Sequence, residues 1–147
     1  SQLDRFLMRI SLGYPSRDAE RELLASNGRR SLADTLPAVI SPAQLQELQA
    51  QVLAVHASEA LLNYVLDLTE ASRNGQWFVQ GISPRAALAL LRAAKAQALV
   101  CGRDFVAPDD VQAVLPQVIA HRLHPVPSAG RGAVAQVQAM MESVALR

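Results

Sequence analysis

Apolar and polar residues alternate with a helical period through most of this chain. Leucine, valine and alanine recur every three or four positions, which is the spacing of an amphipathic helix. This pattern predicts helices over residues 17–26, 43–56, 59–74, 84–101 and 133–146, with one more that starts at Pro108 and is interrupted or ended early by Pro116. The helix over 84–101 is apolar on almost all sides, so we expect it at the centre of the fold.

Local signals mark where these helices begin and end. Serine is a favoured N-cap, and proline is favoured at the first helical position. Serine caps are therefore expected at Ser16, Ser41, Ser58 and Ser83, the second and fourth followed directly by proline. Glycine is the usual residue after a helix end, and the expected stops are Gly28, Gly75 and Gly102.

The first residues of the chain do not follow the helical period. Phe6 to Leu12 is mostly apolar, with Arg9 inside it, and suits a strand. A strand needs a partner, and the sequence offers no second convincing one, which suggests a piece cut from a longer protein. We expect an all-α fold, a small helical bundle with a strand-like N-terminal stub, divided into residues 1–14 (stub), 15–124 (helical domain) and 125–147 (linker and C-terminal helix).

Composition and charge narrow the possible classes. Half of the 147 residues are hydrophobic and 18% are charged, which is enough apolar surface for a packed core. The net charge of +1 is too balanced to indicate nucleic acid or an anionic membrane as a partner. The single cysteine, Cys101, rules out an intramolecular disulfide and fits a reducing cytosol. No apolar run is long enough to span a membrane, so a cytoplasmic location is expected.

Arg85 lies where a helix disfavours a cation. Ser83 and Pro84 start the helix, so Arg85 is in its first turn, beside unpaired N–H groups and the positive end of the dipole. The penalty is about 0.3–1 kcal/mol. A bound anion would reverse it, and phosphate is the natural candidate. Arg92 and Lys95 lie on the same broad face, and for these two residues a solvated helix edge is the favoured explanation.

Other candidate sites are weaker. His121 and His124 have a spacing that can begin a metal site, but no third ligand is close in sequence, so we expect surface histidines and no metal. Cys101 ends a buried helix without an evident base and is expected to be structural. The chain has no phosphate-binding glycine loop, because its only lysine, Lys95, has alanine on both sides. Any nucleotide must therefore be held mainly by another part of a larger protein.

Two long stretches, "LDRFLMRISLGYPSRDAERELL" and "SPRAALALLRAAKAQALVCGRDFVAPDDVQAVLPQVIAHRL", resemble the C-terminal third of a MoxR-type AAA+ ATPase. The resemblance runs from Gln2 to about Leu123. It implies an α/β nucleotide-binding domain followed by a small helical lid, of which this chain would hold the last core strand and the lid. The ATP-binding loop and the acidic metal-coordinating motif would lie upstream, so the chain alone is expected to be inactive.

The same resemblance implies roles for individual residues. Arg85 matches the sensor 2 arginine, which approaches the γ-phosphate of ATP in its own subunit, and Ser83 and Pro84 belong to the same nucleotide-contacting helix start. Arg5 matches the arginine finger, which reaches the nucleotide of a neighbouring subunit. For the full-length protein the family implies ATP and Mg²⁺, a homo-oligomeric ring that is commonly a hexamer, chaperone-like maturation of client proteins, and a von Willebrand factor A domain partner.

The residues alone leave two other functions open. A helical nucleic-acid-binding or regulatory module would use Arg85, Arg92 and Lys95 on phosphates, but the balanced charge and the 4% aromatic content argue against it. A structural interaction bundle would dimerise by pairing its N-terminal stub as a strand.

Overall fold

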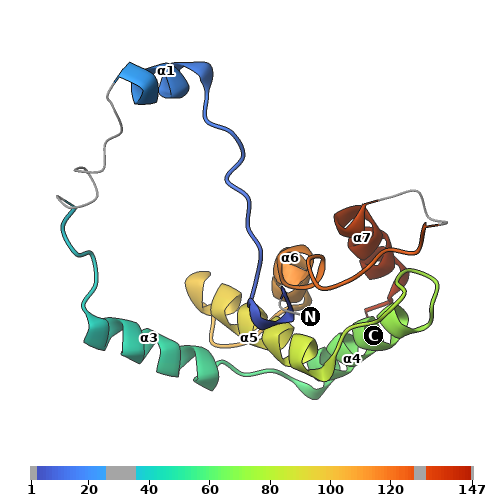
Figure 1. Ribbon diagram of the computed structural model, residues 1–147. Coiled ribbons are helices and arrows are strands. Elements are labelled where there is room, and N and C mark those ends of the chain that lie inside the picture. The colour runs from blue at the N-terminus through green and yellow to red at the C-terminus, as the bar shows by residue number, and fades with distance from the viewer. Residues whose placement is uncertain (1–2, 26–35, 128–131, 147) are drawn as a thin grey trace.

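The computed structural model describes residues 3–25, 36–127 and 132–146. Within these ranges the chain is helical, which confirms the expected all-α fold class. The elements, labelled as in Figure 1, are the 3-10 helix η1 (Leu3–Arg5) and the α-helices α1 (Arg17–Ala25), α3 (Pro42–Ala54), α4 (Glu59–Arg73), α5 (Pro84–Val100), α6 (Pro108–Ile119) and α7 (Ala133–Ser143).

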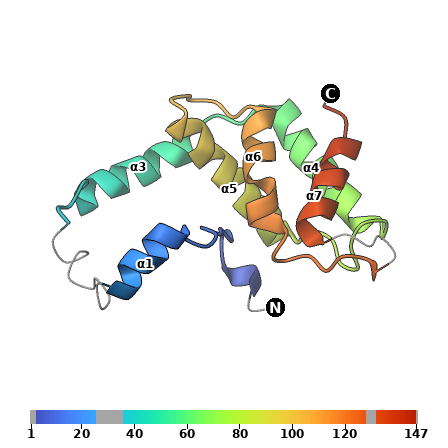
Figure 2. The same ribbon diagram turned by 90° about the horizontal axis from the view of Figure 1, so that it is seen from above.

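Helices α4 to α7 form the packed part of the molecule. Helix α5 lies at its centre, as its apolar composition predicts, and contacts α3, α4 and most extensively α6. Figures 1 and 2 show α1 away from this bundle, at the far end of the segment that follows η1, and α3 reaching outward from the bundle with one end beside α5. The fully buried core side chains come from α4 to α7 and the loop before α5, and include Leu68, Phe78, Ile82, Leu90, Leu115, Ile119, Val137 and Met140.

The predicted serine caps, and the glycine stops that lie in the described chain, are confirmed, whereas the helices predicted over 43–56 and 133–146 end earlier, at Ala54 and Ser143. Each expected serine cap accepts a backbone N–H three residues later, at 3.3 Å for Ser16, 3.2 Å for Ser41 and Ser58, and 3.1 Å for Ser83. Gly75 and Gly102 adopt positive φ after α4 and α5. The Gly102 N–H donates to the Leu99 carbonyl, and the Arg103 N–H donates to the Ala98 carbonyl, both at 2.9 Å. These two bonds form a Schellman motif at the end of α5. The stop expected at Gly28 lies outside the described residues.

The prediction of a strand over Phe6 to Leu12 is wrong, because this segment has no regular structure in the described chain. A strand is stabilised by a ladder of bonds to a neighbour, and the described residues hold only isolated bridges, between His56 and Phe105 and between Phe78 and Pro125. The segment is instead tied to α6, where the Arg9 N–H donates to the Gln117 carbonyl at 2.8 Å. The assignment of residues 1–14 to an ATPase core stays a prediction.

Pro116 does not end α6, which continues to Ile119. Proline removes one intrahelical hydrogen bond, but the turn that follows is anchored by Val118 and Ile119, both completely buried. The Ala120 N–H also donates to the Pro116 carbonyl at 3.0 Å, so the helical bonding resumes directly.

Candidate functional site

The start of α5 is held against the last turn of α4. The Arg73 guanidinium donates to the Ile82 carbonyl from Nε at 3.0 Å and from its terminal nitrogen at 2.8 Å. Ser72 Oγ accepts the Ile82 N–H at 2.8 Å and donates to the Thr69 carbonyl at 2.6 Å. The Ile82 side chain is buried as well. Residue 82 is thus fixed through its N–H, its carbonyl and its side chain, immediately before the helix begins.

Glycine is required at position 81 by this close packing. A Cβ built on Gly81 would lie 2.4 Å from Arg73 Cγ and 2.8 Å from Arg73 Cα. Part of this clash is with backbone, which cannot swing away as a flexible side chain could. Gly81 therefore lets the loop touch α4, and this contact sets where the first turn of α5 points.

The first turn of α5 presents a cation with no partner. Ser83 caps the helix and Pro84 occupies the first position, as predicted. Arg85 is exposed, and within the described residues it makes no hydrogen bond or ion pair. The unfavourable interaction with the helix dipole is therefore not offset by a neighbouring carboxylate.

Arg85 lines a hollow of about 200 Å³ together with three other arginines, Arg5, Arg92 and Arg122. We call this the arginine hollow; Asp4, Leu7, Leu88 and Ala89 complete its lining. Asp4 is the only carboxylate among these residues, against four guanidinium groups. Of the four, only Arg122 has a partner among the described residues, while Arg5 and Arg92 resemble Arg85 in having none. A pocket of this composition favours an anion, because several uncompensated cations share it.

The two arginines implied as sensor and finger thus lie on one hollow in this structure. Arg5 reaches it from η1, and Arg85 and Arg92 from α5, two helical turns apart on one face. Arg92 is exposed, which agrees with its interpretation as part of a solvated helix edge. Lys95 does not line the hollow; its Nζ donates to the Leu53 carbonyl at 3.2 Å.

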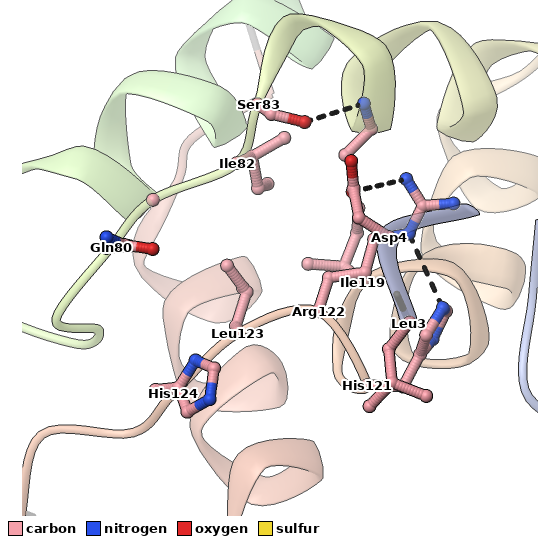
Figure 3. Close-up of a pocket in the computed structure, with 12 residues that line it drawn as sticks. Leu3, Asp4, Gln80, Ile82, Ser83, Ile119, His121, Arg122, Leu123 and His124 are labelled. Carbon is pink, nitrogen blue, oxygen red and sulfur yellow. Dashed lines mark hydrogen bonds and ion pairs between the residues drawn. The ribbon is translucent and has the colours of Figure 1, made fainter. Parts of the chain in front are cut away.

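A second cavity, of about 360 Å³, lies on the other side of the Asp4–Arg122 pair (Figure 3). Its walls come from three places: η1, the loop and cap before α5, and the chain that follows α6. Asp4 and Arg122 line both this cavity and the arginine hollow. Asp4 pairs with Arg122 at 3.3 Å, and within the described chain no ion pair joins Asp4 to the adjacent Arg5.

The histidines and the cysteine carry no evident chemistry here. His121 has Nδ1 at 3.1 Å from the Gln117 carbonyl and Nε2 at 3.2 Å from the Phe6 carbonyl. Over the described ranges, no group of three histidine, cysteine or acidic side chains could hold a metal ion. Cys101 is a free thiol on the surface and not a buried structural residue, because it follows the last turn of α5 beyond the packed core.

A buried ion pair that the sequence pattern did not single out orders the turn between α5 and α6. Asp110 is 2% exposed and accepts two bonds from the Arg103 guanidinium, both at 2.6 Å, and the Ala107 N–H at 2.8 Å. The hydrogen bonds that Arg103 donates to Asp110 hold the pKa of Asp110 below its ordinary value, and the same bonds raise the pKa of Arg103. Neither residue lines the arginine hollow, so this pair supports the fold.

Comparison with known proteins places the helical part of the chain in a family. The family model described as AAA lid domain matches residues 70–143, which includes α5, α6 and α7. No helix among the described residues is both long and apolar enough to cross a bilayer.

Two curated proteins and one solved structure are similar over most of the chain. Chaperone MoxR1 of Mycobacterium tuberculosis is 37% identical over 132 residues, covering 84% of this chain and 34% of its own. Protein MoxR of Paracoccus denitrificans is 37% identical over 139 residues, covering 82% and 41%. A solved structure from Cytophaga hutchinsonii, described as a proposed ATPase, matches with a TM-score of 0.83 and 26% identity, covering 99% of this chain and 48% of that one. The chain therefore spans well under half the length of the curated relatives it matches.

Proposed function

The chain belongs to the AAA lid domain family and is of the MoxR type, and from this premise we propose that it closes over ATP and couples hydrolysis to the remodelling of client proteins. In this proposal Arg85 is the sensor that contacts the γ-phosphate. Ser83 and Pro84 shape the helix start that carries it. The observation that supports the proposal most strongly is the arginine hollow, where Arg85 lies beside further cations and has no partner among the described residues.

The chemistry of phosphoryl transfer fits such a surface. Catalysis of this reaction depends largely on positioning and on positive charge around the transferred group. A guanidinium on a rigid helix start supplies both, and it binds the phosphate only when the lid is close to the nucleotide. Closure and hydrolysis would then be linked through one side chain.

The remaining functions belong to the larger assembly. We propose that ATP and Mg²⁺ are bound mainly by a nucleotide-binding domain outside the chain described here, and that the full-length protein forms a homo-oligomeric ring, a hexamer as is common in the family. Arg5 would then act as the finger for a neighbouring subunit. Chaperone activity on protein clients, with a von Willebrand factor A domain partner, completes the proposal; the name of the relative Chaperone MoxR1 supports its first part.

Replacement of Arg85 in the full-length protein tests the central role. Arg85→Ala should lower the turnover number for ATP hydrolysis about 10–100-fold, because one charge-assisted contact to the transition state is lost. Arg85→Lys should recover only part of the rate, since lysine lacks the planar fork. The matched control is Arg21→Ala, an exposed arginine on α1 outside the hollow, which should hydrolyse ATP at the wild-type rate.

Unchanged turnover in Arg85→Ala would remove the sensor role. Equal losses in Arg85→Ala and Arg21→Ala would mean that the arginine hollow has no special part in hydrolysis. The 147-residue chain alone should bind ATP weakly, and tight binding by isothermal titration would contradict the division of labour proposed here.

A further inference from the structure

Arg122 is a nearly buried arginine that the proposed nucleotide contacts do not use. Its side chain is 5% exposed and lies at the end of α6, between the cavity of Figure 3 and the arginine hollow. A buried guanidinium is costly unless its donors are satisfied. The acceptors that satisfy it come from a segment more than 110 residues away in sequence.

Those acceptors lie on both sides of Arg5. Arg122 donates to Asp4 Oδ1 at 3.3 Å, to the Phe6 carbonyl at 2.6 Å and to the Leu7 carbonyl at 3.3 Å. One guanidinium group, that of Arg122, thus holds three groups that flank Arg5. The Arg5 side chain itself stays unpaired among the described residues and lines the hollow. These hydrogen bonds restrain the backbone of Arg5 and leave its charge available.

Two more contacts hold the same segment to α6. The Arg9 N–H donates to the Gln117 carbonyl at 2.8 Å, and His121 Nε2 lies 3.2 Å from the Phe6 carbonyl. The surface that receives the segment is itself rigid, because Ile119 and Leu123 beside Arg122 are buried in the core. The segment that carries Arg5 is therefore held in place by α6 and by the turn that follows it.

We propose that Arg122 is a positioning residue for Arg5: it fixes the Arg5-bearing segment to the lid, so that the arginine offered to the neighbouring subunit moves as one body with the lid of its own subunit. This inference rests on the proposed function, in which Arg5 acts in trans. It adds a route by which closure of one lid changes hydrolysis at the next site around the ring.

Mixed rings of the full-length protein separate positioning from a structural role. One subunit type carries Arg5→Ala and an intact nucleotide site. The other carries intact Arg5 and a disabled nucleotide site, so that ATP turnover requires Arg5 to act across the interface. Arg122→Met is then introduced into either type, with Arg122→Lys and Asp4→Asn as milder variants that keep part of the contact set.

Arg122→Met in the Arg5-donating subunit should reduce the rescued turnover roughly tenfold or more, because small misplacements of a catalytic group are costly. The same change in the other subunit should lower turnover much less, since that subunit has no Arg5 to position. Arg122→Lys and Asp4→Asn in the donating subunit should give smaller losses.

Equal losses from both placements would overturn the inference in favour of a purely structural role for Arg122. Full rescue with Arg122→Met in the donating subunit would overturn it as well, while leaving the proposed role of Arg5 intact. If Arg5 fails to rescue in trans even with Arg122 present, the finger assignment fails and the inference fails with it.

Discussion

At the scale of single residues, Arg85 and Arg122 differ in what surrounds their charge. Arg122 is buried and its donors are satisfied by Asp4 and two carbonyls, whereas Arg85 is exposed and has no partner in the described chain. A buried and paired arginine is suited to holding structure. An exposed and unpaired one beside a helix start is suited to an anion that arrives from outside. The two roles proposed above follow this difference.

Gly81 should tolerate no side chain. We predict that Gly81→Ala lowers the free energy of unfolding by about 1–3 kcal/mol, because the added Cβ would overlap the backbone of Arg73. Denaturant titration of the chain measures this change. Gly132→Ala is the control, since a Cβ there meets nothing within 4 Å; it should cost less than about 1 kcal/mol, through its position as the N-cap of α7. Equal effects at both positions would contradict the close approach seen at Gly81.

Asp110 should make stability depend on pH. Its pKa is lowered in the folded chain by the Arg103 contact, so the contribution of this pair is complete above the unfolded-state pKa, about pH 4, and is lost as the pH falls through the lower folded-state value. Asp110→Asn should therefore lower the melting temperature at pH 7, and the difference from wild type should shrink below about pH 4.

Thermal melting across this pH range checks the prediction, with Asp109→Asn as the control. Asp109 is the exposed neighbour in the first turn of α6 and makes no bond to Arg103 in the described structure. A difference between wild type and Asp110→Asn that stays constant from pH 7 to pH 2 would contradict the assignment.

At the scale of helices, burial separates α5 from α3. Leu90 on α5 is completely buried, whereas Leu53 on α3 is 66% exposed. Leu90→Ala should cost about 2–5 kcal/mol of unfolding free energy, through lost transfer energy and a residual cavity. Leu53→Ala should change it by less than about 0.5 kcal/mol. Denaturant titration of both variants makes the comparison, and similar losses would mean that α3 is packed in a way that the described chain does not show.

Helix boundaries could be predicted from sequence because their determinants are local. A serine cap bonds an N–H three residues away, so Ser41 and Ser83 identify their helices without reference to the rest of the fold. The burial of a helical face is not local. Leu45 and Leu48 follow a helical apolar pattern, yet they are 46% and 42% exposed, because α3 contacts the bundle only through part of its length.

The same contrast between local and non-local signals explains why only part of the candidate site could be predicted. Arg85 stands out because Ser83 and Pro84, directly before it, mark a helix start, where a positive charge is disfavoured by the helix dipole. Arg122 does not stand out in the sequence, because its role depends on hydrogen bonds to the carbonyls of Phe6 and Leu7, which only the folded chain brings close to it. The apolar run from Phe6 to Leu12 indicated a strand, but its partner in the described chain is the end of α6, which no periodicity along the sequence reveals.

At the scale of the whole molecule, the described chain presents a polar surface and a number of exposed apolar side chains outside the packed bundle. The arginine hollow forms the polar surface, at the junction of η1 and α5. The exposed apolar side chains lie on the N-terminal segment, on the chain before α3 and on α3 itself, and include Leu12, Tyr14, Val39 and Leu53. A lid that closes on a nucleotide-binding domain needs a positively charged surface such as the arginine hollow, and the proposed function depends on this hollow and not on the exposed apolar side chains.

The most direct test of the central claim compares two nucleotides that differ by the γ-phosphate. Affinities of a slowly hydrolysed ATP analogue and of ADP are measured by isothermal titration for the full-length protein and for Arg85→Ala. If Arg85 contacts the γ-phosphate, Arg85→Ala should weaken binding of the ATP analogue about 10–100-fold, the equivalent of one charge-assisted hydrogen bond, and leave ADP affinity unchanged. Equal weakening of both nucleotides, or no change in either, would contradict the account.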